Sequence, residues 1–222
     1  MFDPPQSDAW RNARLLMVAA QLRARGIRDE RVLAAMARVP RHEFVRHEDR
    51  EEAYDDHPLP IGEAQTVSQP FVVAAMLEAL ALQPEDVVLE VGTGSGYETA
   101  VLAELARKVY SVERIASLAD RARAALAQLG YSNVMVVPGD GSLGLPDAAP
   151  FDAIVVAAAA PRVPASLISQ LCEGGRLVIP VGDSFAQELQ LVRRIGDSST
   201  ILHLEAVRFV PLIGREGFRD AD

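Results

Sequence analysis

The stretch that decides the fold is Val87-Val88-Leu89-Glu90-Val91-Gly92-Thr93-Gly94-Ser95-Gly96-Tyr97. Its first half is rich in β-branched and apolar residues, which is typical of a buried strand. Glycine then occupies every second position, and a helical pattern runs from Tyr97 to Ala106. Because glycine lacks a Cβ atom, this turn lets the backbone approach a ligand before the helix packs back on the strand. The stretch therefore predicts a nucleotide-type cofactor site.

The pattern around this stretch alternates between strands and helices. We expect strands at 87–91, 108–112, 134–138, 153–157 and 176–181, and helices at 97–106, 115–129 and 165–172. Apolar strands without alternation indicate a parallel sheet covered on both faces. Segments 187–196 and 201–210 flank a turn cluster and predict an antiparallel hairpin at the sheet edge. The fold class is therefore α/β, with a doubly wound, mainly parallel sheet and an antiparallel C-terminal hairpin.

An N-terminal helical extension precedes the sheet. An apolar stripe over 15–22 stops at Gly26, and Asp29 is expected to cap a second helix that ends before Pro40. Residues 40–68 show little periodicity. Ser68 is expected to cap a third helix, with Pro70 in its first turn.

We expect a single domain over residues 1–222. Residues 1–82 would form the helical region and a substrate loop, and residues 83–213 the cofactor-binding α/β core with the C-terminal strands. The polar segment 214–222 is expected to be a frayed tail.

Composition excludes several functional classes. The chain has 222 residues, and 31 acidic against 22 basic residues give a net charge of -9, so neither nucleic acid nor an anionic membrane is an expected partner. No run approaches the roughly 18 apolar residues of a membrane span. The start, Met1-Phe2-Asp3-Pro4-Pro5, lacks the pattern of a signal peptide. With Cys172 as its only cysteine, the protein is expected to be cytoplasmic.

The glycine turn and two acids indicate which cofactor binds. Gly92, Gly94 and Gly96 give G-x-G-x-G rather than the dinucleotide fingerprint, which suits a ligand without a pyrophosphate. Glu113 ends the next strand about 20 residues later, where an acid can accept from both ribose hydroxyls. Asp140 follows the third strand and can accept from an adenine amino group. Each acid alone is better explained as a solvated turn residue, but together they indicate an adenosine site of the S-adenosyl-L-methionine (AdoMet) type.

A second motif is the block from Pro60 to Pro70, between the helical region and the sheet. In one interpretation it is a loop in which Ser68 only caps a helix. In the other, the Thr66 and Ser68 hydroxyls and nearby backbone N–H groups orient a substrate carboxylate. The two roles are compatible, because the N-terminus of a helix favours an anion.

These motifs make the chain recognisable, since it resembles the bacterial protein-L-isoaspartate (D-aspartate) O-methyltransferase family from about Leu15 to Gly214. The glycine turn is shared by many methyltransferases. The Gln65–Pro70 and Val210–Leu212 blocks are more specific, and Val112-Glu113-Arg114 and Gly139-Asp140-Gly141 also match. The resemblance implies a Rossmann-like fold that transfers a methyl group from AdoMet to the free α-carboxylate of L-isoaspartyl residues. The products would be a methyl ester and S-adenosyl-L-homocysteine (SAH), with no metal ion involved.

The resemblance also assigns site residues. Ser68 would be the active-site serine, with Gln65, Thr66 and Val67 on the substrate and methyl side and Val210 in the peptide cleft. Glu113 would bind ribose, and Asp140 with Gly141 would bind adenine. The remaining cofactor contacts would come from Glu90, Gly92, Thr93, Gly94, Ser95, Gly96 and Arg114. The partners implied are isoaspartyl proteins and peptides, and the expected state is a monomer.

Two departures from the family pattern concern the substrate loop. Ala64 adds a methyl group where relatives often have glycine, and Phe71 stands where some relatives carry histidine or tyrosine. Two alternative functions stay open: an AdoMet methyltransferase for a small molecule, and a non-catalytic AdoMet-binding protein.

Other polar residues are given structural roles. We interpret Asp55-Asp56-His57 as a solvated run rather than a metal site, and His42 and His47 as exposed. His203 is expected to be structural, and Cys172 a buried residue at the end of a helix.

Overall fold

The computed structural model describes residues 4–219. The described range leaves out residues 1–3 and residues 220–222. The first three belong to the N-terminal segment that lacks a signal-peptide pattern, and the last three belong to the expected tail.

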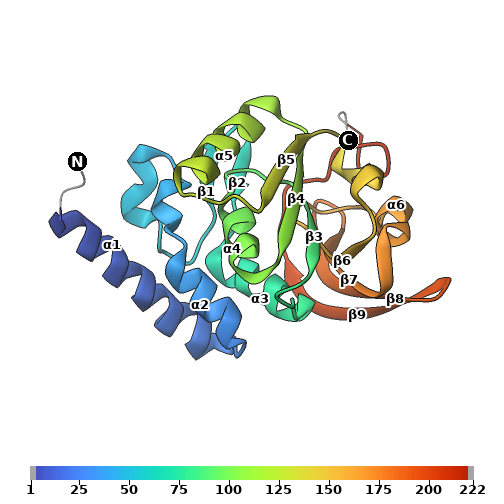
Figure 1. Ribbon diagram of the computed structural model, residues 1–222, viewed down its shortest axis with the longest axis horizontal. Coiled ribbons are helices and arrows are strands. Elements are labelled where there is room, and N and C mark those ends of the chain that lie inside the picture. The colour runs from blue at the N-terminus through green and yellow to red at the C-terminus, as the bar shows by residue number, and fades with distance from the viewer. Residues whose placement is uncertain (1–3, 220–222) are drawn as a thin grey trace.

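The centre of the molecule is a seven-stranded sheet in the order β5-β4-β3-β6-β7-β8-β9 (Figure 1). The strands are β3 (Val87–Val91), β4 (Lys108–Glu113), β5 (Val134–Pro138), β6 (Phe151–Val156), β7 (Leu171–Gly182), β8 (Gln187–Ile195) and β9 (Ser198–Val207). Strands β3 to β7 pair in parallel, whereas β8 runs antiparallel to both β7 and β9. The predicted fold class, including the C-terminal hairpin, is therefore confirmed.

Helices cover both faces of the sheet. On one face α3 (Pro70–Leu80), α4 (Tyr97–Leu105) and α5 (Ala116–Gln128) pack over a core that includes Val88 and Val178. On the other face α6 (Ala165–Ser169) packs over Leu89 and Leu177. Neighbouring side chains of one strand thus enter different cores, because successive Cβ atoms in a strand point to opposite faces.

The N-terminal helices form a further layer outside α3 and α4 (Figure 1). Helix α1 (Pro4–Leu16) continues through a π-helical segment, η1 (Met17–Leu22), and a 3-10 turn, η2 (Arg23–Arg25), and ends at Gly26 with φ +116°. Helix α2 (Glu30–Arg38) begins at Asp29, whose Oδ1 accepts from the Arg31 N–H at 2.8 Å. The stop at Gly26 and the Asp29 cap are confirmed.

The structure corrects the prediction for the start of α3. The N-cap position is Gln69 rather than Ser68, and its side chain does not cap the helix. The cap comes from Asp56, whose Oδ1 accepts from the Phe71 N–H at 3.2 Å and whose Oδ2 accepts from Gln69 Nε2 at 2.7 Å. Asp56 is therefore not part of a solvated run, and Ser68 is free of a capping role.

The segment predicted to be irregular contains a small hairpin. Strands β1 (Leu59–Gly62) and β2 (Gln65–Val67) pair antiparallel, preceded by 3-10 turns η3 (Arg41–Glu43) and η4 (His47–Glu52). At its tip Glu63 and Ala64 both have φ +55°. This left-handed conformation is the one that two-residue hairpin turns require and that glycine adopts most easily.

Further corrections concern His42, Cys172 and the tail. His42 is buried, stacks on Trp10 at a centroid distance of 5.0 Å and hydrogen-bonds Tyr54 Oη at 2.7 Å. The predicted helix at 165–172 ends at Ser169, so Cys172 is a half-buried residue of β7. His47 and His203 are exposed, and His203 contacts Glu188 across β8 and β9.

The tail up to Arg219 is not frayed. The Arg215 N–H donates to Asp140 Oδ2 at 2.8 Å, and the Glu216 N–H donates to Ser142 Oγ at 3.0 Å. Ser166 in turn donates to Glu216 through both its N–H and its hydroxyl. A polar composition alone did not predict these contacts, because the acceptors lie about 75 residues away in the sequence.

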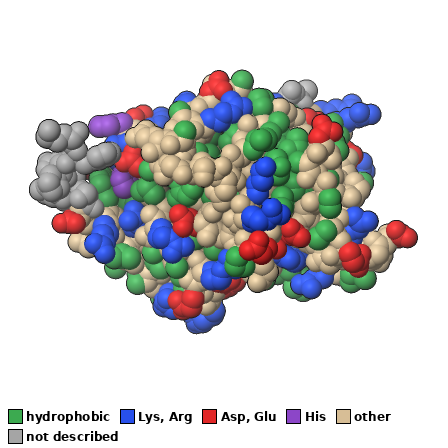
Figure 2. Space-filling model, in the orientation of Figure 1, with side chains coloured by type: hydrophobic (Ala, Val, Ile, Leu, Met, Phe, Trp, Pro, Cys, Tyr) green, Lys and Arg blue, Asp and Glu red, His purple; other side chains and the backbone are tan. Residues whose placement is uncertain are grey.

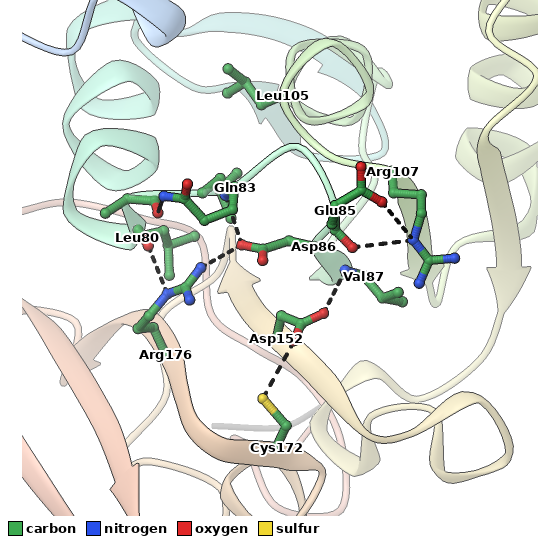
Figure 3. A network of polar contacts seen from close by, with 12 residues as sticks. Leu80, Gln83, Glu85, Asp86, Val87, Leu105, Arg107, Asp152, Cys172 and Arg176 are labelled. Carbon is green, nitrogen blue, oxygen red and sulfur yellow. Dashed lines mark hydrogen bonds and ion pairs between the residues drawn. The ribbon is translucent and has the colours of Figure 1, made fainter.

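A largely buried ion pair joins α3, β3 and β7 at the amino ends of the parallel strands (Figure 3). Arg176 donates to Asp86 Oδ2 at 2.5 Å and to the Leu80 carbonyl at 2.8 Å. Asp86 also accepts from the Gln83 N–H, while Asp152 accepts from the Val87 N–H at 2.8 Å. This network fixes the sheet on the side away from the glycine turn, which follows the carboxyl end of β3.

The surface carries both signs of charge, and acidic and basic side chains alternate with hydrophobic patches on the face shown in Figure 2. Within residues 4–219, every helix is too short or too polar to cross a membrane.

Candidate active site

A cavity of about 370 Å³ opens at the carboxyl ends of β3 and β4. The glycine turn forms one wall, the substrate loop 64–68 a second, and the segment 210–213 after β9 a third. Ligands of open α/β sheets bind at this edge, where the chain leaves the parallel strands. The predicted cofactor turn and the predicted substrate loop are therefore brought to one place.

The backbone of the glycine turn is shaped for close approach. Gly92, Gly94 and Gly96 have φ of +95°, +53° and +89°, a region that other residues enter at a cost. At Gly141, which closes the cavity from the loop after β5, a Cβ atom would overlap Val91 Cγ1. These positions need glycine, and they let a ligand lie directly on the backbone.

Glu113 faces the glycine turn from the end of β4. Its carboxylate accepts from the Gly94 N–H through Oε2 and from the Ile115 N–H through Oε1, both at 2.9 Å. The side chain is largely buried yet lines the cavity. Since each carboxylate oxygen accepts up to two hydrogen bonds, Glu113 can still receive two hydroxyl groups of a ligand.

Asp140 is held beside the cavity by its own loop and by the tail. Its Oδ1 accepts from the N–H and the hydroxyl of Ser142 at 2.9 and 2.7 Å, and its Oδ2 accepts from Arg215. These contacts fix the carboxylate but leave Oδ2 a second lone pair for a ligand amino group.

Two buried carboxyl groups lie next to the glycine turn. Glu90 lies behind the cavity wall, and Glu98 is part of that wall. Glu90 is fully buried, and its Oε2 accepts from Thr99 and Ser111 at 2.5 Å each. Thr93 extends this network to the turn through Ser111. Glu98, in the first turn of α4, lines the cavity. Burial raises the pKa of Glu98 to about 8, and burial together with the charge of Glu98 raises the pKa of Glu90 well above its usual value.

A second hollow of about 620 Å³ adjoins the cavity. It runs between the start of α3 and the chain after β9, with Gln69, Val72 and Phe209 in its walls. Thr66, Ser68, Ala157 and Val210 line both hollows. Ser68 therefore lies where the cofactor cavity meets the second hollow, which we call the groove.

Most of the site residues predicted from the sequence lie around this cavity. Those that line it are Gln65, Thr66, Val67, Ser68, Gly92, Thr93, Gly94, Ser95, Glu113, Arg114, Gly141 and Val210. Glu90, Gly96 and Asp140 support the wall without lining it. Sequence reasoning missed Glu98, although its place two residues after Gly96 in the first turn of the helix was a usable signal. It also assigned no site role to Val73, Ile115 or Ile213, and it named Pro211 and Leu212 only as part of the family-specific block.

Comparison with known proteins identifies the family. Residues 12–217 match the family model described as Protein-L-isoaspartate(D-aspartate) O-methyltransferase (PCMT). The chain belongs to the PCMT family. Among curated relatives, Protein-L-isoaspartate O-methyltransferase 2 of Pelobacter propionicus is 58% identical over 207 residues, which cover 92% of each chain. The Protein-L-isoaspartate O-methyltransferase of Roseiflexus sp. (strain RS-1) is 60% identical over 190 residues, covering 86% of this chain and 87% of the relative.

Solved PCMT structures share the fold. The structure of one protein-L-isoaspartate O-methyltransferase superposes on this chain with a TM-score of 0.83 and 29% sequence identity. The aligned region covers 93% of this chain and 67% of the other chain. A second structure, from Plasmodium falciparum, is assigned to PCMT and is in complex with SAH. It superposes with a TM-score of 0.79 and 26% sequence identity, and the aligned region covers 90% of this chain and 98% of the other chain. The cofactor of the PCMT family is AdoMet.

The residues of this chain fit AdoMet. The turn of positive-φ glycines and the crowded Gly141 provide a backbone cradle, and Glu113 offers acceptors for a diol. Within the described residues, no group of three or more His, Cys, Asp or Glu side chains is arranged to hold a metal ion.

Proposed function

We propose that this chain is a repair methyltransferase that acts on the free α-carboxylate of L-isoaspartyl residues in damaged proteins and peptides. AdoMet supplies the methyl group as an activated donor and leaves as SAH, while the substrate becomes a methyl ester. The observation that carries the proposal is the position of Ser68 at the junction of the cofactor cavity and the groove. A peptide in the groove would present its carboxylate to the cavity at this point.

On the cofactor side, the described contacts support a division of roles. Glu113 would accept the ribose hydroxyls, and its bonds to Gly94 and Ile115 hold it in place before the ligand arrives. Asp140 and Gly141 would bind adenine, with Asp140 oriented by Ser142 and Arg215. Gly92 to Ser95 would pass along the methionine part, and Arg114 would lie near the ribose.

On the substrate side, the chain needs orienting groups rather than a base. A carboxyl group with a reference pKa near 4 is ionised at neutral pH, so it is already a nucleophile. Ser68 and Thr66 would donate hydrogen bonds that align it, with Gln65 and Val67 beside them. Val210 and the following residues would close the cavity against water, which favours direct transfer over side reactions.

The test is methyl transfer from labelled AdoMet to two peptides that differ only in isoaspartate or aspartate at one position. We expect base-labile label on the isoaspartyl peptide alone. Label on neither peptide, with AdoMet binding intact, would contradict the substrate assignment and favour a small-molecule acceptor or a non-catalytic role. Label on both would contradict the selectivity for isoaspartate.

We also propose that the protein works as a monomer in the cytoplasm without nucleic acid or membrane partners. The net charge of -9 supports the absence of nucleic-acid and anionic-membrane partners, and the free thiol of Cys172 supports the cytoplasm. Sedimentation of the purified protein tests the monomer, and a sedimentation coefficient that rises with protein concentration would contradict it.

A further inference from the structure

Glu98 is a buried acid that the proposed mechanism does not use. It lies at the start of α4 with only 7% of its surface exposed, and its Oε1 is buried without a hydrogen-bond partner. The same residue lines the cofactor cavity. A buried oxygen without a partner is costly to the protein alone and needs an explanation. Because Glu98 is also part of the cavity lining, we look for that explanation in the ligand.

Burial alone raises the pKa of Glu98, and among residues 4–219 its Oε1 has no hydrogen-bond partner. Behind it lies Glu90 of β3, which is itself short of a partner at Oε1. Glu113 and Arg114 line the same cavity from the end of β4, and uncharged Val73 and Ser68 line it from the side of α3. Arg41 is separated from this wall by the Tyr97 ring, over which its guanidinium packs at 4.8 Å from the centroid. Because the carboxyl group of Glu98 is buried, its protonated form is favoured at neutral pH in the ligand-free protein.

The charge of the two cofactor forms differs by one. AdoMet carries a sulfonium, an ammonium and a carboxylate, whereas SAH has lost the sulfonium charge with the methyl group. An opposite charge within about 4–6 Å lowers the pKa of a carboxyl group by roughly 1–3. Because burial places the pKa of Glu98 at about 8, a cation in the cavity would bring it to neutral pH or below.

We propose that the protonation state of Glu98 depends on the charge of the bound cofactor. Glu98 releases its proton to solvent when AdoMet binds and keeps it when SAH binds. This inference rests on the proposed function. Ionised Glu98 attracts the cationic donor, and reprotonation after transfer removes that attraction from the neutral product. The effect is a site that prefers AdoMet to SAH and releases its product more readily.

Titration calorimetry tests this inference without turnover. The heat of AdoMet binding at pH 7 is measured in buffers with different ionisation enthalpies, and its slope gives the protons released. From a pKa of about 8 that falls by roughly 1–3, we expect about 0.4 to 0.9 proton released per AdoMet at pH 7 and clearly fewer per SAH. The variant Glu98→Gln keeps the shape of the side chain but has no proton to release. It should show little proton release with AdoMet and a preference for AdoMet over SAH reduced about 10-fold.

A matched control lies on the same helix. Glu104, which pairs with Arg38 outside the cavity, is substituted as Glu104→Gln and should keep the wild-type proton release. The titrating amino group of the ligand is common to all variants, so the difference between wild type and Glu98→Gln isolates Glu98.

The outcomes separate the two proposals. Absence of AdoMet binding to the wild type would overturn the proposed function itself. AdoMet binding without proton release, or with equal release for AdoMet and SAH, would overturn only the role of Glu98, and would fit a neutral acid that donates a hydrogen bond to the ligand. Because the wild-type measurement decides this by itself, the test stands even if Glu98→Gln fails to fold.

Discussion

The Glu113 carboxylate accepts a hydrogen bond from the Gly94 N–H at 2.9 Å, so the end of β4 is tied to the glycine turn that follows β3. The same carboxylate accepts from the Ile115 N–H. An acid held by two backbone donors is positioned before the ligand binds, which reduces the entropy lost on binding.

We therefore expect Glu113→Ala to weaken AdoMet binding. Each lost charge-assisted hydrogen bond contributes about 1.5–3 kcal/mol, which corresponds to an affinity reduced roughly 10-fold to 150-fold. Isothermal titration measures this effect, and Glu51→Ala, which removes an exposed carboxylate outside the cavity, serves as the control. An unchanged affinity in Glu113→Ala would show that the ribose contact is wrongly assigned.

Ser68 permits a sharper test, because it has no capping role to lose. We expect Ser68→Ala to lower turnover of the isoaspartyl peptide by about 10-fold or more, the effect of one hydrogen bond to a charged group. AdoMet affinity should stay close to that of the wild type. Steady-state kinetics and titration of the same sample measure both quantities, with Ser169→Ala on the exposed end of α6 as the control. Equal loss of turnover and affinity would contradict an orienting role on the substrate side.

The helix caps at Asp29 and before Phe71 show which contacts can be predicted from the sequence and which cannot. Asp29 caps the helix that begins beside it, and such local geometry can be predicted from spacing. The cap of α3 comes from Asp56, 15 residues before the Phe71 N–H that it accepts from, and a local pattern does not contain that information. The strands at 87–91 and 134–138 were predicted with their observed bounds, because continuous apolar runs between turn residues are also local signals.

Some residues of the candidate site could likewise be predicted from the sequence, and others could not. The turn glycines and Glu113 were predicted from motif and order, since the carboxyl ends of parallel strands meet at one edge, whereas Ser68 was predicted from the family resemblance of the Gln65–Pro70 block. The position of Glu98 just after the glycine turn is a local signal, but its burial beside Glu90 is seen only in the packed structure. The burial of His42 likewise depends on stacking against Trp10 from another helix.

The hairpin before Ser68 offers a stability prediction. Glu63 and Ala64 both have φ +55°, a conformation in which a Cβ atom is unfavourable. Ala64→Gly should therefore raise the free energy of unfolding by ~1 kcal/mol. The control Ala124→Gly, at an exposed position inside α5, should lower it by ~1 kcal/mol. Denaturant unfolding measures both, and a loss of stability in both variants would contradict the strain at the hairpin tip.

The ion pair at the opposite edge of the sheet predicts a large effect on stability. Asp86→Ala would leave the Arg176 guanidinium, whose side chain is 16% exposed, without its charged partner. Removing one member of a buried pair costs ~3–5 kcal/mol. Glu85→Ala removes the neighbouring exposed acid seen in Figure 3, which lies 3.9 Å from Arg107, and should change stability by less than ~0.5 kcal/mol. Similar losses in the two variants would contradict the structural role of the Arg176–Asp86 pair.

Glu98 predicts an unusual pH dependence of stability in the ligand-free protein. Burial raises its pKa to about 8 in the folded state, whereas an unfolded chain would hold it near 4.5, so the folded state binds more protons between these values. Stability from this group is fully present below the unfolded pKa and is lost as pH rises towards 8. The loss should approach ~1.4 kcal/mol per pH unit. Urea unfolding at pH 5.5, 6.5 and 7.5 measures it for the wild type and Glu98→Gln. We expect the variant to gain stability relative to the wild type as pH rises, whereas parallel pH curves would contradict a proton held by Glu98.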